Sequence, residues 1–60
     1  MTTLLSLLPS GTDGDQGTQA VVNYLYRRNA LHHAMVMENG QWYVVKKNIV
    51  LDAIKILFSK

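Results

Sequence analysis

The sequence predicts a small α+β fold in which a β-hairpin lies between helices. The first indication is the Asn39-Gly40 pair, which stands between two apolar, β-prone arms. The second is the helical spacing of apolar residues before and after this segment. The chain has 60 residues, which is enough for one domain. The expected order of elements is therefore helix, loop, helix, β-hairpin and helix.

A leucine-rich segment comes first, and we expect it to form a short helix. Its leucines fall at positions i, i+1, i+3 and i+4, which is helical spacing: Leu4, Leu5, Leu7 and Leu8. Thr2 or Thr3 can cap this helix, and Pro9 can end it. A strand is the alternative, because periodicity cannot decide so short a run.

Residues 10–17 are predicted to form a flexible loop, since three glycines and two aspartates fall within them. The Asp13-Gly14-Asp15 part resembles a calcium loop only in its first residues, so a plain turn is the better interpretation. The expected organisation is a single domain over residues 1–60, with this loop in front of a helix-hairpin-helix unit over residues 18–58.

The second expected helix runs from Gln19 to Asn29. Thr18 is a suitable N-cap residue, and Asn29 is suited to the left-handed conformation that ends many helices. Its apolar residues form one broad stripe: Val21, Val22, Leu25 and Tyr26.

The hairpin has a predictable register, because Asn-Gly favours a two-residue type I′ turn. The expected cross-strand pairs are Glu38 with Gln41, Met37 with Trp42, Val36 with Tyr43, and Met35 with Val44. Met37 and Trp42 then share a face, which we expect to pack on a helix; an adaptable peptide-binding face is the alternative.

The last expected helix is capped by Asn48, with Asp52 near its start and Lys55 and Lys60 towards its end. Its wide apolar face consists of Ile49, Val50, Ala53, Ile54, Leu57 and Phe58. Leu51 and Ile56 extend beyond this face, so the helix should contact something on two sides. That second contact is either the rest of the chain or a second subunit. For a homodimer, the expected interface residues are Val50, Ile54, Leu57 and Phe58.

Charge favours an anionic partner. From residue 18 onward there are six Lys and Arg residues against two acidic residues, although an ordinary solvated surface can carry the same charge.

The chain has no cysteine, which excludes disulfides, thiolate metal sites and a cysteine nucleophile. His32 and His33 are adjacent, so they suit a linker better than a metal site. With four acidic residues and no catalytic motif, we expect no enzyme, no metal and no cofactor. A membrane span would need about 18 consecutive apolar residues, so we expect a cytoplasmic protein without membrane contact.

Residues 21–57 carry a pattern of apolar and basic positions in a helix, hairpin and helix. The positions that carry it are Val21, Tyr24, Leu25, Arg27, Arg28, Leu31, Gly40, Trp42, Val44, Lys46 and Lys47. This pattern resembles the winged helix-turn-helix domains of the excisionase and mercury-resistance-regulator type. The resemblance implies a winged helix-turn-helix-like fold, transcription regulation or direction of recombination, and an origin in a mobile element. The chain departs from the family in its glycine-rich insertion before the helix and in Asn29, where the family usually has glycine.

Binding to duplex DNA is accordingly the predicted function. Polar side chains near the start of the recognition helix would reach base edges, and the residues of suitable type are Thr18, Gln19 and Asn23. Phosphate contacts would come from Arg27, Arg28, Lys46 and Lys47. The alternative is a non-enzymatic protein-interaction module, an inhibitor or adaptor, which binds a partner or itself through the apolar C-terminal helix.

Overall fold

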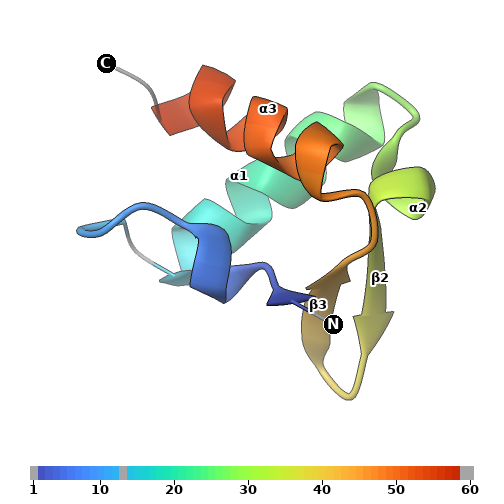
Figure 1. Ribbon diagram of the computed structural model, residues 1–60, viewed down its shortest axis with the longest axis horizontal. Coiled ribbons are helices and arrows are strands. Elements are labelled where there is room, and N and C mark those ends of the chain that lie inside the picture. The colour runs from blue at the N-terminus through green and yellow to red at the C-terminus, as the bar shows by residue number, and fades with distance from the viewer. Residues whose placement is uncertain (1, 13, 59–60) are drawn as a thin grey trace.

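The computed structural model describes residues 2–12 and 14–58. Within them the chain forms three helices, one 3₁₀ turn and a three-stranded antiparallel sheet (Figure 1). The elements in order are β1 (Thr2–Thr3), η1 (Leu5–Leu7), α1 (Gly14–Arg27), α2 (Leu31–Ala34), β2 (Met35–Glu38), β3 (Gln41–Val44) and α3 (Lys47–Phe58). The predicted α+β class is confirmed, and the arrangement is compatible with a winged helix-turn-helix.

The hairpin is formed by β2 and β3 in the predicted register. All four expected pairs are present: Met35 with Val44, Val36 with Tyr43, Met37 with Trp42, and Glu38 with Gln41. Asn39 and Gly40 have φ values of 52° and 78°, as a type I′ turn requires. Local turn chemistry thus fixes this element.

The N-terminal segment differs from the prediction, because Thr2 and Thr3 are not helix caps but form β1. They pair with Val44 and Tyr43, which gives the sheet order β1-β3-β2. The Leu4 N–H then donates to the Trp42 carbonyl at 3.0 Å. Only the single 3₁₀ turn η1 is present where a helix was expected, because Thr2 and Thr3 pair with the sheet instead of starting a helix.

Helix α1 begins in the predicted loop. Gly14 is its first residue, so the prediction of a loop is wrong for residues 14–17, and Thr18 lies inside the helix rather than at its cap. The C-terminal end is as expected: Asn29 has a φ of 56°. Its N–H donates to the Tyr26 carbonyl at 3.0 Å, and the Ala30 N–H donates to the Leu25 carbonyl at 2.9 Å. This is a Schellman cap.

Helix α2 is one turn within the predicted linker, and its Ala34 carbonyl joins it to the next helix. That carbonyl accepts from the Val45 N–H at 2.7 Å and from the Lys46 N–H at 3.1 Å. Helix α3 follows from Lys47, so Asn48 lies in its first turn and is not the cap. Asp13 and Lys60, which belong to the predicted turn and the predicted helix end, lie outside the described residues.

The core draws on every part of the fold. It consists of Leu4, Val21, Leu25, Ala34, Met35, Val44, Val50, Ala53 and Ile54. Helices α1 and α3 pack on each other above the hairpin (Figure 1). Among the helices of the described residues, none has the length and apolar character needed to cross a membrane.

Candidate nucleic-acid interface

The order of α1, α2 and the hairpin is compatible with a helix-turn-helix motif in which α2 is the second helix. Three residues separate α1 from α2, which is the usual length of the turn in this motif. In such motifs the second helix enters the major groove; by this order of elements α2 would take that place instead of residues 19–29, and which helix meets DNA stays a prediction. Helix α2 has four residues, about 6 Å of helix. Only the exposed His32 and His33 project from it, with ring centroids 4.3 Å apart.

The predicted base-contacting residues all lie on α1, but they line two different hollows. Thr18 and Gln19 line a hollow that also contains Asp15. Asn23 lines a different hollow, together with Arg27 and Arg28. The Gln19 Nε2 donates to the Asn23 Oδ1 at 2.9 Å, so these two side chains are joined by one hydrogen bond on the exposed side of α1.

Arg27 is the last residue of α1 and Arg28 follows it directly; both are exposed. The Arg28 guanidinium lies over the Tyr24 ring, 4.6 Å from its centroid. Together these side chains line a hollow of about 470 Å³, whose other lining residues are Ala20, Asn23 and Leu57. The C-terminal part of α1 therefore presents two guanidinium groups, one of them held against an aromatic ring.

The end of α1, the whole of α2 and the start of α3 lie next to one another (Figure 1). The hydrogen bonds to the Ala34 carbonyl hold α2 against the residues that lead into α3. We call this region the basic end; its exposed side chains are Arg27, Arg28, His32, His33, Lys46 and Lys47. The segments that contribute them, residues 27–34 and 46–47, contain no aspartate or glutamate.

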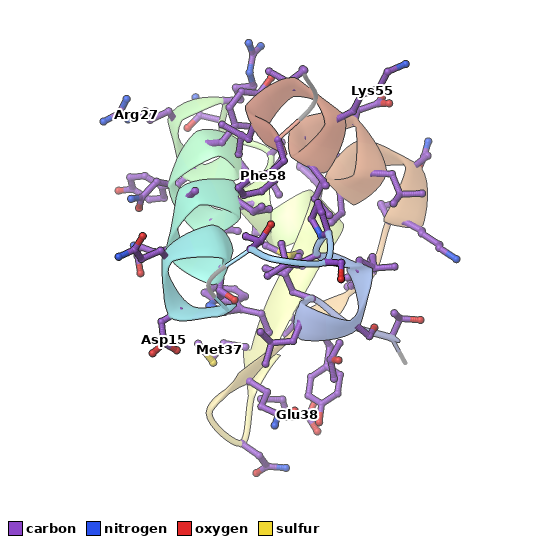
Figure 2. All side chains as sticks on the ribbon, turned by 90° about the vertical axis from the view of Figure 1, so that its left-hand side faces the viewer. Asp15, Arg27, Met37, Glu38, Lys55 and Phe58 are labelled. Carbon is purple, nitrogen blue, oxygen red and sulfur yellow. The ribbon has the colours of Figure 1, made fainter. Side chains whose placement is uncertain are left out.

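Asp15 and Glu38 lie away from the basic end, whereas Asp52 is exposed on α3. Figure 2 shows Arg27 and Lys55 in the upper half of the molecule, and Asp15 and Glu38 in the lower half, towards the hairpin. The hairpin turn is therefore on the more acidic side, which is unfavourable for insertion into a groove lined by phosphates. The electrostatic field at the basic end is more favourable for an anion than the field at the hairpin turn.

The predicted interface on α3 is largely used by the protein itself. Val50 and Ile54 are 0% and 7% exposed and belong to the core, so they cannot form an interface with another molecule. Phe58 is half-buried against the core, and Leu57 is 37% exposed. Besides Leu57, the apolar residues that reach the surface here are Leu51 and Ile56 on α3 and Val45 just before it; Leu51 and Ile56 lie outside the predicted apolar stripe. The sequence signal for Leu51 and Ile56 was that the last helix has more apolar residues than one face can hold.

No protein-family model, curated protein or solved structure matches this chain. Within residues 2–12 and 14–58, no group of three or more His, Cys, Asp or Glu side chains is placed to hold a metal ion.

Proposed function

We propose that the protein binds the phosphate backbone of duplex DNA through the basic end. The observation that carries this proposal is that four permanent cations and two histidines are all exposed on or next to α1, α2 and α3, three elements in mutual contact, and that the segments contributing them lack carboxylates. Each cation that neutralises a phosphate releases a counterion, which favours binding at low salt.

Backbone contacts outweigh base contacts in this proposal, since α2 is a single turn. Arg27 and Arg28 would contact phosphates on one side of α2, and Lys46 and Lys47 on the other. The first turn of α3 holds no acidic residue, so the positive end of its dipole adds to the attraction for an anion. We therefore expect weak discrimination between sequences. A role in transcription or recombination is what the resemblance implies, and we include it in the proposal together with a cytoplasmic location.

Charge reversal at one position inside the basic end and one outside tests the proposal. Arg27→Glu and Lys55→Glu change the net charge equally, but Lys55 lies near the C-terminal end of α3 and is not among the side chains of the basic end. We expect Arg27→Glu to weaken binding to a fluorescent 20-base-pair duplex about tenfold at low salt, and Lys55→Glu by less than about threefold. Circular dichroism checks the fold of both variants.

Two results would contradict the proposal. One is the absence of any anisotropy change at tens of micromolar wild-type protein, where non-specific binders are detected. The other is an equal loss for both variants, which would mean that net charge alone governs the interaction.

A second candidate function is protein interaction, and exposed apolar side chains favour it. Ile56 is 62% exposed and Leu51 41% exposed on α3, and Val45, just before the helix, is 51% exposed. We propose that these residues join two copies in a homodimer or contact a protein partner. Sedimentation equilibrium of the wild type and of Ile56→Asp tests the homodimer, with Leu5→Asp as control because Leu5 is 55% exposed on η1. A concentration-dependent mass that only Ile56→Asp abolishes would support it; a monomer at all concentrations would exclude it.

A further inference from the structure

A second hollow, of about 330 Å³, lies between the N-terminal segment, the start of α1 and the hairpin. We call it the hairpin hollow; its lining residues used below are Leu5, Asp15, Thr18, Gln19, Gln41 and Trp42. Its walls come from three segments that are distant in the sequence. The hollow is therefore a product of the fold, and it is separate from the basic end.

Polar and apolar side chains share the lining of the hairpin hollow, and one of its polar groups is a carboxylate. Asp15 supplies a carboxylate and Thr18 a hydroxyl, and none of the lysines, arginines and histidines that the structure describes lines the hollow. Gln19 and Gln41 each add an amide oxygen. Because the Nε2 of Gln19 donates to Asn23, its oxygen remains as an acceptor. These groups suit a ligand that donates several hydrogen bonds and carries positive charge.

Aromatic and thioether groups complete the wall. Trp42 is half-buried, and Met37 beside it is 49% exposed. Figure 2 shows Met37 next to Asp15, with Glu38 further down the hairpin. An indole ring attracts a cation at its face, and the neighbouring carboxylates give this side of the molecule a negative field.

We propose that the hairpin hollow binds the guanidinium group of an arginine side chain from a partner polypeptide. A guanidinium is planar, donates five hydrogen bonds and stacks on aromatic rings. Its N–H groups would donate to the Asp15 carboxylate and to the amide oxygens of Gln19 and Gln41, while its plane contacts Trp42. Charge complementarity favours arginine over an acidic or apolar side chain, since Asp15 is the charged residue of the lining.

Trp42 is the single tryptophan of the chain, so its fluorescence reports on this site directly. The probe is Nα-acetyl-arginine amide, and the matched control is Nα-acetyl-citrulline amide, which has the same shape without the charge. We expect a saturable fluorescence change with the arginine probe and at least fivefold weaker binding of the citrulline probe. Equal responses, or no saturation with arginine, would overturn the proposal.

Two isosteric variants locate the site. Asp15→Asn and Asp52→Asn remove the same charge from exposed positions on α1 and α3. We expect Asp15→Asn to weaken binding of the arginine probe about fivefold, and Asp52→Asn to leave it unchanged. In a ¹H–¹⁵N spectrum, the probe should shift the Trp42 indole N–H and the Gln41 side-chain amide. An equal effect of both variants, or shifts confined to other residues, would refute the assignment.

This inference is independent of the proposed DNA binding. Asp15→Asn alters the hairpin hollow alone, so duplex binding by this variant should match the wild type or rise slightly. Failure of the arginine titration would leave the basic end untouched, and failure of the DNA titration would leave the hairpin hollow untouched.

Discussion

The guanidinium of Arg28 lies over the ring of Tyr24, with its Cζ 4.6 Å from the ring centroid. The residues are four apart, so successive turns of α1 place them on the same side. Tyr24 is itself half-buried against the core. The ring thus restrains one cation of the basic end before any ligand arrives, which lowers the entropy lost when that cation is fixed by a phosphate.

The first prediction concerns this pair. A double-mutant cycle with Tyr24→Leu and Arg28→Gln should give a coupling free energy of about 0.5–1 kcal/mol, as expected for an exposed cation–π contact. Urea unfolding of the four proteins, followed by circular dichroism, measures it. A cycle with Arg27→Gln in place of Arg28→Gln is the control, and its coupling should be close to zero. If the Arg27 cycle gives the larger value, the contact with Arg28 does not exist in solution.

The second prediction separates two adjacent leucines. Leu4 is 1% exposed in the core, whereas Leu5 is 55% exposed on η1. Leu4→Ala should lower the free energy of unfolding by about 2–4 kcal/mol through lost burial and a cavity. Leu5→Ala should change it by less than about 0.5 kcal/mol. Thermal and urea unfolding compare the two, and similar losses would show that the N-terminal segment does not dock as described.

Gly17 gives the third prediction, because a Cβ at this position would lie 2.7 Å from Thr12 Cγ2 and 3.1 Å from Leu8 Cδ1. Gly17→Ala should therefore destabilise the protein by about 1–3 kcal/mol, despite the better helix propensity of alanine. Gly14→Ala is the matched control, since its Cβ meets only the movable end of Leu5 at 3.0 Å. Denaturant unfolding that ranks Gly14→Ala as the more damaging variant would contradict this packing.

Sequence reasoning succeeded where structure depends on neighbours along the chain. The hairpin follows from Asn39-Gly40, since few residue pairs tolerate positive φ at both positions. Strand β1 could not be found in this way. Two residues have no periodicity of their own, and Thr2 and Thr3 become a strand only because β3 offers them an edge.

Helix α1 shows the opposite failure, in which packing overrides local preference. Glycine is a poor helix former, so Gly14 and Gly17 predict a loop. In the fold, Gly17 is buried against Leu8 and Thr12, where a larger residue would not fit. The tight approach between α1 and the N-terminal segment explains why the helix extends through these glycines.

The candidate site was predictable in composition but not in arrangement. The excess of Lys and Arg from residue 18 onward is readable from the sequence. The residue at which α1 begins cannot be read from the sequence. Because α1 begins at Gly14, Thr18 and Gln19 lie near Asp15 and the hairpin. The hairpin hollow escapes sequence reasoning entirely, because Asp15, Gln41 and Trp42 meet only after the sheet and α1 have packed.

The fourth prediction is the salt dependence of duplex binding. Four permanent cations in the basic end imply up to four phosphate contacts. The logarithm of the binding constant should therefore fall with the logarithm of salt concentration with a slope of about −3 to −4. Lys46→Ala combined with Lys47→Ala should make the slope about 2 units shallower.

Lys55→Ala is the control and should leave the slope unchanged, because this lysine lies outside the basic end. The slopes come from anisotropy titrations at roughly 20 to 200 mM salt, the range over which phosphate contacts weaken. A slope that responds to Lys55→Ala but not to the double substitution would place the DNA on another face of the molecule.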